Sequence, residues 1–264
     1  MAGDVLAALE QSRQNESNPT AAKIIGQLIE NAKIAKDDRI PICQDTGLAV
    51  VFIEIGTEVR IAPPAEKPGA TIVEAVNDGV CRGYETGLLR KSVVAEPLRE
   101  RKNTNTNTPA IVYTEILPGD GLNISVMAKG GGCENKSVFK MFLPTTAKEE
   151  IVDWVSEVVI DAGANACPPF VVGVGIGGNF ENSCFLSKKS LLRRLETSND
   201  DAFYAEMEQE ILKKINASGL GPQGLGGDTT ALGVLIEARP CHIASLPVAV
   251  NIECHAHRHA SARL

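Results

Sequence analysis

The sequence lacks a long apolar run and lacks the pattern of an export signal. No stretch of its 264 residues approaches the roughly 18 consecutive apolar residues that a transmembrane helix needs. The N-terminus shows no basic segment followed by an apolar one, which a secretory signal peptide would have. We therefore expect a soluble, cytoplasmic protein that does not contact a membrane.

Positive charge and flexible linkers are also scarce. The chain has 26 Lys and Arg against 33 Asp and Glu, for a net charge of -7, whereas binding to a nucleic acid needs clustered cations. We therefore expect no nucleic-acid partner. No Pro/Ser-rich or low-complexity stretch marks a domain boundary, and 44% hydrophobic residues suffice for a core. The sequence predicts one domain over residues 1–264, with two lobes as the alternative.

The cysteines are odd in number, have no regular spacing and include no C-x-x-C pair. There are seven of them: Cys43, Cys81, Cys133, Cys167, Cys184, Cys241 and Cys254. Without an export signal, such a set does not indicate a disulfide framework. We expect reduced thiols, and we expect Cys81, Cys184 and Cys241 to be small buried hydrophobic residues.

Three cysteines stand in segments rich in turn-forming and small polar residues: Cys43 in PICQDTG, Cys167 in NACPPFVVGVGIGG and Cys254 in NIECHAHRHA. Function is concentrated on loops of this kind. Three thiolates can hold an iron-sulfur cluster by three of its four irons, and the fourth iron then acts as an open Lewis acid. This interpretation requires folding to bring three distant segments together.

Two other classes of protein remain open at this point. An electron-transfer protein would use four cysteine ligands, commonly at short spacing. A zinc-stabilised binding module could use the histidines near the C-terminus, which are His242, His255, His257 and His259. A structural zinc site usually closes with a second pair of closely spaced ligands, and the sequence contains no such pair.

Hydrophobic periodicity predicts alternating helices and strands. We expect helices over 19–36, 70–85, 146–162 and 201–217, and strands over 48–55, 110–116, 122–128, 171–176, 231–237 and 247–253. The strands 110–116 and 122–128 are predicted to pair with each other across the turn at 118–121. The pattern is typical of an α/β fold, with α+β as the alternative, in which mixed sheets are flanked by helices and functional loops lie at sheet edges.

Two glycine-rich stretches have competing interpretations. Residues 173–178, GVGIGG, match G-x-G-x-x-G, which is a dinucleotide-binding turn when it follows the first strand of a βαβ unit. That first unit is missing here, which disfavours the match. Residues 129–136, KGGGCENK, can form a turn whose backbone amides approach an anion, or a plain tight turn.

Taken in order, seven motifs carry a family resemblance. They are PICQDTG, LLRKSVV, KNTNTNTPA, KGGGCENK, NACPPFVVGVGIGG, GPQGLGGDTTALGV and NIECHAHRHA. Over roughly residues 18 to 260, the chain resembles the alpha subunit of two-subunit class I fumarate hydratases and L-tartrate dehydratases. The resemblance implies an iron-sulfur hydro-lyase that acts on a dicarboxylate. It also implies a hetero-oligomer, in which a separate beta subunit supplies the rest of the active site.

The resemblance implies specific ligands for the cofactor. In the family, the residues that match Cys43, Cys167 and Cys254 hold a 4Fe-4S cluster, and the substrate binds the remaining iron. This chain departs from the pattern at Cys133, where single-chain relatives have serine after the triple glycine. Cys133 is therefore a fourth thiol that we expect near the cluster but not among its ligands.

Further residues match substrate contacts of the family. Gln44 and Asp45 match residues that touch the substrate, and Asp45 matches a group that moves a proton at the leaving hydroxyl. Arg90 matches a guanidinium that binds a carboxylate. Gly132 matches a backbone contact with the substrate, and His242 matches a catalytic histidine at the carboxylate end of the substrate.

The implied reaction is the reversible hydration of fumarate to L-malate, with dehydration of L-tartrate to oxaloacetate as the alternative. Expelling hydroxide requires an acid at the hydroxyl, and removing a weakly acidic carbon-bound proton requires a base and charge stabilisation at the carboxylate. The resemblance assigns that base to the beta subunit. The chain alone is therefore expected to be inactive.

Overall fold

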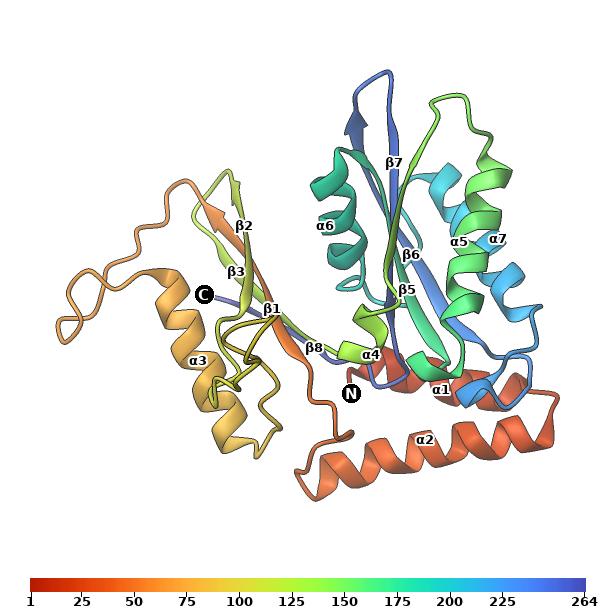
Figure 1. Cartoon of the computed structure of the whole chain (residues 1–264), viewed down its shortest axis with the longest axis horizontal. Coiled ribbons are helices and arrows are strands. Elements are labelled where there is room, and N and C mark those ends of the chain that lie inside the picture. The colour runs from red at the N-terminus through yellow and green to blue at the C-terminus, as the bar shows by residue number, and fades with distance from the viewer. The chain divides into compact units, whose positions relative to one another are not determined.

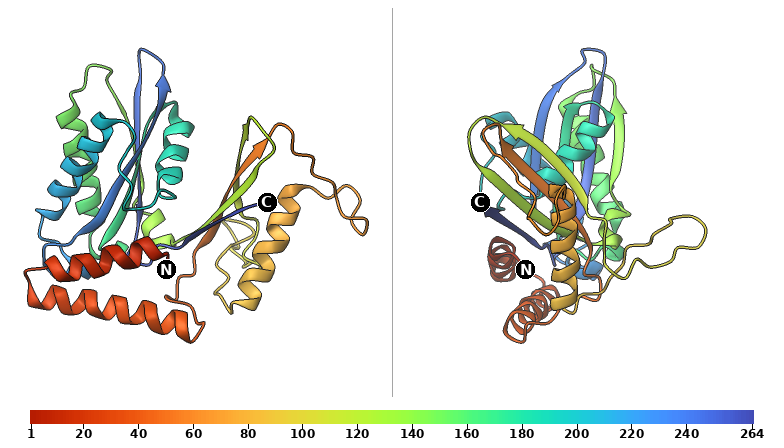
Figure 2. Two further views of the ribbon diagram at one scale, coloured as in Figure 1. Left: turned by 180° about the vertical axis from the view of Figure 1, so that it is seen from behind. Right: turned by 90° about the vertical axis from the view of Figure 1, so that its left-hand side faces the viewer.

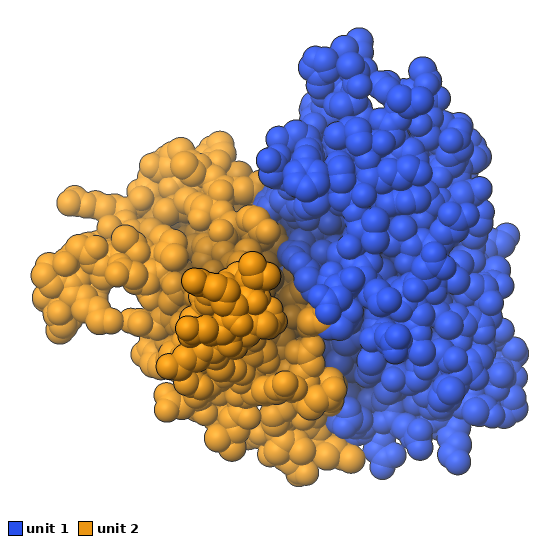
Figure 3. Space-filling model, in the orientation of Figure 1, with its two compact units in different colours: residues 1–33, 132–257 blue, residues 34–131, 258–264 orange.

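The computed structural model describes residues 1–264 and has helices together with two four-stranded mixed sheets (Figure 1), which confirms the predicted α/β class. The chain divides into two compact units, which Figure 3 distinguishes by colour. Unit 1 comprises Met1–Lys33 and Gly132–His257, and unit 2 comprises Ile34–Gly131 and Arg258–Leu264. None of the helices is both long enough and apolar enough to span a lipid bilayer.

The sheet of unit 1 has the strand order β4-β7-β5-β6. These strands are β4 (Val138–Phe142), β5 (Phe170–Gly178), β6 (Ala231–Cys241) and β7 (Leu246–Glu253). Helix α6 (Phe180–Ser190) covers one face, while α5 (Lys148–Ala162) and α7 (Ala202–Asn216) cover the other, as the views in Figure 2 show. The main apolar core lies between the sheet and the helices α5 and α7. Burial on both faces explains the continuous apolar run of β5.

The GVGIGG motif lies within strand β5 and does not form a turn. Gly173 and Gly175 face α6, where an added Cβ would stand 2.0 Å from the carbonyl oxygens of Ser187 and Ser183, respectively. These glycines therefore allow the helix to approach the sheet closely. The dinucleotide-binding interpretation is wrong, because the backbone amides of this segment are paired with β6 and β7.

The N-terminal region of unit 1 forms two helices. α1 (Gly3–Asn15) was not predicted, because its sequence shows little amphipathic contrast, whereas α2 (Pro19–Asp37) begins at the predicted residue. The side chain of Asn18 caps α2 by accepting the N–H of Thr20 at 2.9 Å. Leu9 of α1 packs with Ile25 and Ile29 of α2, so the two helices share a small apolar core.

The sheet of unit 2 has the strand order β2-β1-β3-β8. These strands are β1 (Leu48–Gly56), β2 (Ile111–Leu117), β3 (Leu122–Lys129) and β8 (His259–Arg263). The prediction that β2 and β3 pair with each other is wrong, because β1 lies between them, parallel to β2 and antiparallel to β3. The β2–β3 turn crosses the end of β1 at Gly56, where an added Cβ would stand 2.1 Å from the oxygen of Gly119. The most apolar strand thus occupies the central position.

Both sheets have the same topology. In each, a central strand (β1 or β5) pairs in parallel with the following strand (β2 or β6) and antiparallel with the next one (β3 or β7). An antiparallel edge strand completes each sheet: β4 pairs with β7, and β8 pairs with β3. The two sheets exchange their edge strands along the chain. After β3 of the unit 2 sheet, the chain continues into β4 of the unit 1 sheet, and after β7 of the unit 1 sheet it continues into β8 of the unit 2 sheet.

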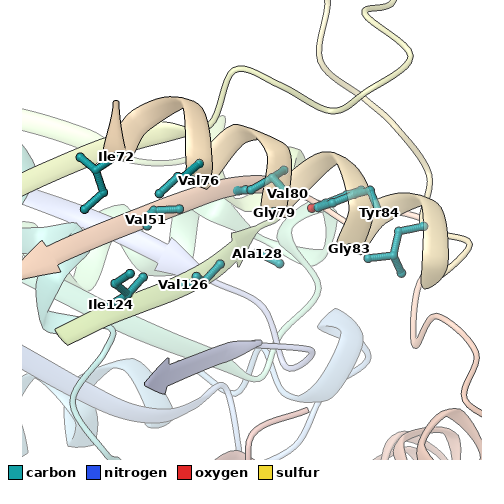
Figure 4. A pocket seen from close by; sticks show the side chains of 13 residues that line it. Val51, Ile72, Val76, Gly79, Val80, Gly83, Tyr84, Ile124, Val126 and Ala128 are labelled. Carbon is teal, nitrogen blue, oxygen red and sulfur yellow. The ribbon is translucent and has the colours of Figure 1, made fainter. Parts of the chain in front are cut away.

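Helix α3 (Ile72–Thr86) packs on one face of the sheet of unit 2 and begins with a capping box between Thr71 and Glu74. Between α3 and strands β1 and β3 lies an apolar groove of about 510 Å³, shown in Figure 4. Small residues on the helix, including Gly79 and Gly83, leave this space open. The groove has no cationic lining and is therefore not a suitable site for a dicarboxylate.

Candidate functional site

The three predicted ligand cysteines lie where strands begin or end. Cys43 is half-buried at the corner between α2 and β1 in unit 2. Cys167 is exposed between the short helix η1 (Ala164–Ala166) and β5, and Cys254 directly follows β7, both in unit 1. All seven cysteines are free thiols. The expectation that Cys81, Cys184 and Cys241 are buried is wrong, because Cys241 is exposed and the other two are only half-buried.

The loops of Cys167 and Cys254 meet within unit 1. The N–H of His255 lies 3.4 Å from the carbonyl oxygen of Cys167, and Nδ1 of the same histidine lies 3.1 Å from that oxygen. A carbonyl can only accept a hydrogen bond, so this contact is a hydrogen bond in the tautomer that carries the proton on Nδ1. The antiparallel pairing of Val171 with Glu253 explains this meeting, because it places the start of β5 beside the end of β7.

The GPQGLGG segment supports the Cys167 loop. The backbone N–H and the Nε2 of Gln223 both donate to the carbonyl oxygen of Pro168, at 2.8 and 2.7 Å. The same Nε2 lies 3.2 Å from Nδ1 of His255. Gln223 and Cys167 have positive φ angles of 56° and 58°, a region that non-glycine residues occupy only when the surroundings hold them there.

Cys133 and Glu253 lie close to Cys254. The sulfur of Cys133, in the short helix α4 (Gly131–Glu134), is 3.5 Å from the carbonyl oxygen of Ala166 and is buried. One ligand atom from each of Cys133, Glu253 and Cys254 lies within 4.8 Å of the others, and Glu253 is fully buried. Unit 1 therefore brings two thiols and a carboxyl group together.

The histidines do not form the group that the zinc interpretation required. Nδ1 of His255 binds the carbonyl oxygen of Cys167, whereas Nε2 of buried His257 lies 2.8 Å from the carbonyl oxygen of Leu191. The two rings thus hold different backbone segments. The cluster that could take a metal ion contains cysteines and a glutamate instead.

In unit 2, the PICQDTG loop brings four predicted site residues together. The sulfur of Cys43 lies 3.2 Å from Oε1 of Gln44. The Asp45 carboxylate accepts the N–H of Gly47 at 3.0 Å with one oxygen and the N–H of Gly131 at 2.7 Å with the other. The hydroxyl of Thr46 donates to the carbonyl oxygen of Arg90 at 2.6 Å. The exposed Arg90 therefore lies beside the same loop. The glycine turn at 129–136 therefore does bind an anion through an amide, and that anion is Asp45.

Three further side chains fix the backbone of this loop. The hydroxyl of Tyr84 lies 2.9 Å from the carbonyl oxygen of Thr46 and 2.8 Å from that of Gly47. The Nδ2 of buried Asn107 donates to the oxygen of Gly47 at 3.1 Å, and Nη1 of Arg258 donates to that of Asp45 at 3.0 Å. Burial raises the pKa of Tyr84, although nearby Arg258 acts in the opposite direction. The phenol is therefore protonated at neutral pH.

Comparisons with known proteins show the family of the chain. A family model described as fumarate hydratase (fumerase) matches residues 1–263. The chain is 40% identical to the putative L(+)-tartrate dehydratase subunit alpha of Methanocaldococcus jannaschii, over 99% of this chain and 91% of that protein. It is 30% identical to the L(+)-tartrate dehydratase subunit alpha of Escherichia coli strain UTI89, over 100% of this chain and 86% of that protein.

The chain belongs to the fumarate hydratase family. This confirms the resemblance found in the sequence, and the family together with the names of the relatives supports a hydro-lyase. In the E. coli strain K12 relative, also named L(+)-tartrate dehydratase subunit alpha, 31% of residues are identical over 98% of this chain and 84% of that protein.

Of two further predicted substrate residues, one lies beside a cysteine loop and the other lies far from it. Gly132 lies beside the Cys167 loop, since an added Cβ would stand 3.5 Å from the carbonyl oxygen of Asn165. His242 is exposed in the turn between β6 and β7, where its Nδ1 accepts the N–H of Ala244 at 3.1 Å. Strand β7 separates His242 from Cys254, and eight residues at about 3.3 Å each place them roughly 25 Å apart.

Four side chains that support the cysteine-bearing loops were not predicted from the sequence. Gln223 and Asn107 lie in motifs that carry the family resemblance, GPQGLGGDTTALGV and KNTNTNTPA, which was the available signal. Tyr84 is on the predicted helix 70–85 and follows its apolar spacing, so nothing marked its hydroxyl. Arg258 lies within NIECHAHRHA, where the histidines were considered as zinc ligands.

Proposed function

We propose that the chain is the alpha subunit of a two-subunit hydro-lyase that dehydrates L(+)-tartrate to oxaloacetate. The observation that carries this proposal is the 40% identity, over almost the whole chain, to a protein named as the alpha subunit of such an enzyme. Fumarate hydration is the second candidate, because the matching family model carries that name. The first expectation from the sequence favoured fumarate, and the names of the relatives favour tartrate instead.

The proposed cofactor is a 4Fe-4S cluster held by Cys43, Cys167 and Cys254. Thiolates are the usual ligands of such clusters. The donor chemistry fits the cluster because the loops of Cys167 and Cys254 meet in unit 1 and Cys43 is a half-buried thiol at a loop in unit 2. When bound, a cluster with three cysteine ligands would supply one Lewis-acidic iron for a substrate hydroxyl.

The residues of the PICQDTG loop would bind and orient the substrate. Dehydration breaks a C–O bond, whose oxygen leaves as water after gaining a proton, and a C–H bond on the neighbouring carbon. The product enol then becomes oxaloacetate by moving a proton from oxygen to carbon. Asp45 is our candidate for the proton exchange at the departing hydroxyl, because two backbone N–H groups fix its carboxylate. Arg90 and the amide of Gly132 would bind a substrate carboxylate, and Gln44 would contact the substrate.

Two parts of the proposed site would come from other chains. The base that removes the carbon-bound proton is assigned to the beta subunit, so the chain alone would not turn over. His242 and Cys254 lie at opposite ends of β7. A role for His242 at the carboxylate end of the substrate therefore requires a second copy of this chain to supply it.

The test is an anaerobic assay of the chain co-expressed with its beta subunit, supplied in turn with L-tartrate, L-malate and fumarate. We expect iron and sulfide to copurify, and kcat/KM to be highest for L-tartrate. Cys43→Ser should abolish cluster assembly, whereas Cys184→Ser, on α6, should not. Higher kcat/KM for fumarate would favour the second candidate, and full activity of the chain alone, or after prolonged aeration, would contradict the split site and the open iron.

The placement of His242 has its own test. His242→Ala and Cys254→Ser would each inactivate the assembled enzyme, but mixed oligomers of the two variants would regain part of the activity. Activity returns because, in a mixed oligomer, one site combines the intact Cys254 of the His242→Ala copy with the intact His242 of the Cys254→Ser copy. Mixed oligomers that form but stay inactive would contradict the supply of His242 by a second copy, and full activity of His242→Ala itself would remove His242 from the site.

A further inference from the structure

We propose that unit 1 contains a site for a single thiophilic divalent cation, such as Zn²⁺, formed by Cys133, Glu253 and Cys254. This ligand set differs from the three-cysteine set, because it does not include Cys43 or Cys167. All three residues belong to unit 1. The relation of the site to the cluster, with which it shares Cys254, rests on the proposed function.

The geometry of the three side chains fits one ion. Their ligand atoms lie within 4.8 Å of one another. Around tetrahedral zinc, with Zn–S near 2.3 Å and Zn–O near 2.1 Å, ligand atoms are about 3.3 to 3.8 Å apart. The ligand atoms therefore need to approach one another by about 1 Å to coordinate one ion.

The chemistry of the donors also favours this class of cation. Two thiolates and one carboxylate match the ligands that zinc uses, whereas magnesium and calcium need sites made of oxygen. Cys133 is 4% exposed and Glu253 is fully buried, so solvent does not compete for these atoms. The half-buried Cys254 leaves the fourth position open to water.

The backbone that carries Cys133 is fixed relative to Cys254. The neighbouring Glu134 binds Lys188 of α6 with one carboxylate oxygen and accepts Nδ2 of Asn251 of β7, at 3.4 Å, with the other. Asn251 lies in β7, three residues before Cys254. The short helix α4 is thereby tied to the end of β7, so the two thiols are held near each other before any metal arrives.

The pairing of β4 with β7, which aligns Val138 with Val250, explains why Cys133 lies near the end of β7. Cys133 follows β3 in the chain as Cys254 follows β7, and these are the equivalent strands of the two sheets. Because Cys254 serves both ligand sets, a bound divalent ion and a complete cluster exclude each other. The site would therefore capture zinc in cluster-free protein and oppose cluster assembly.

The experiment is a titration of full-length, cluster-free chain with Co²⁺ under anaerobic conditions, followed by displacement with Zn²⁺. Cobalt reports thiolate ligands through sulfur-to-metal charge-transfer absorption. We expect one equivalent to bind with a two-thiolate spectrum. Cys133→Ser and Cys254→Ser should each halve the charge-transfer intensity and weaken binding by about a hundredfold, and Glu253→Gln should weaken it by about tenfold, since each removes one ligand.

Matched controls make the outcome decisive. Cys43→Ser and Cys184→Ser should bind cobalt as the wild type does, and circular dichroism should show that every variant is folded, with Cys133→Ala as a second variant at that position. Absence of binding, an unchanged spectrum in folded Cys133→Ser, or loss of binding in Cys43→Ser would each overturn the proposal. A chain that binds cobalt in this way but never assembles a cluster would refute the proposed function and leave this site intact.

Discussion

The Nδ1 atom of His255 lies 3.1 Å from the carbonyl oxygen of Cys167. This contact joins two loops that are almost ninety positions apart in the chain, and the Nε2 of Gln223 reaches both of them. It forms because β5 and β7 are antiparallel, which places the beginning of one beside the end of the other. Two cysteine loops therefore meet through strand pairing and are then fixed by side-chain hydrogen bonds.

Gln223→Leu removes the amide that donates to the carbonyl oxygen of Pro168. Losing one such hydrogen bond costs about 1 kcal/mol, or about a fivefold change in an equilibrium. We expect the reconstituted protein to lose iron to a chelator about fivefold faster than the wild type. The matched control is Gln14→Leu on the exposed side of α1. Equal rates of iron loss in both variants would show that Gln223 does not hold the cysteine loop.

Arg258→Met removes a guanidinium that donates to the carbonyl oxygens of Asp45 and Ala128, at 3.0 and 3.4 Å. Because Asp45 is proposed to exchange a proton and not to set affinity, we expect kcat of the assembled enzyme to fall about tenfold with little change in KM. Arg258→Lys should recover only part of the loss, since lysine lacks the forked donors. Arg82→Met on exposed α3 is the control, and a rise in KM alone would contradict this role.

Tyr84→Phe removes the hydroxyl that binds the carbonyl oxygens of Thr46 and Gly47. We expect the free energy of unfolding at neutral pH to decrease by about 1 kcal/mol. Burial raises the pKa of Tyr84 above its ordinary value of 10.0, so the folded protein holds this proton more tightly than the unfolded chain does. The resulting stability is complete below pH 10 and is lost as the pH rises above it.

The phenylalanine variant should therefore show a shallower loss of stability above pH 10 in denaturant titrations. Tyr204→Phe is a matched control, because burial also raises the pKa of Tyr204 and this residue lies on α7. Both variants should flatten the alkaline slope, but only Tyr84→Phe should speed iron loss from reconstituted protein. An alkaline slope unchanged by Tyr84→Phe would contradict a raised pKa.

Gly173→Ala places a methyl group 2.0 Å from the backbone oxygen of Ser187, which belongs to α6 and cannot rotate away. We expect destabilisation of about 3 kcal/mol or more, because the helix must move off the sheet. Gly79→Ala on α3 has no atom within 4 Å of the added carbon, and it should stabilise by about 1 kcal/mol. Thermal unfolding of both variants tests this, and a neutral Gly173→Ala would argue against close helix packing.

Local patterns predicted most elements of the fold but not their partners. The apolar runs at 48–55 and 171–176 became β1 and β5, and the apolar face of α2 was correct. The predicted pairing of β2 with β3 was wrong. A short connecting turn favours a hairpin locally, but burial of the apolar β1 between the two strands stabilises the sheet as a whole. Helices α1 and α6 were missed, because close packing on Gly173 and Gly175 compensates for the polar serines of α6.

The sequence by itself determined the family, the α/β class and the positions of the cysteine-bearing turns, because these depend on residue identity and on local periodicity. Only the tertiary structure decided that the loops of Cys167 and Cys254 meet, that Cys133 and Glu253 lie close to Cys254, and that His242 lies at the other end of β7. Such relations depend on which strands pair and in which direction. Strand pairing is set by burial summed over a whole sheet, and no short stretch of sequence contains that information.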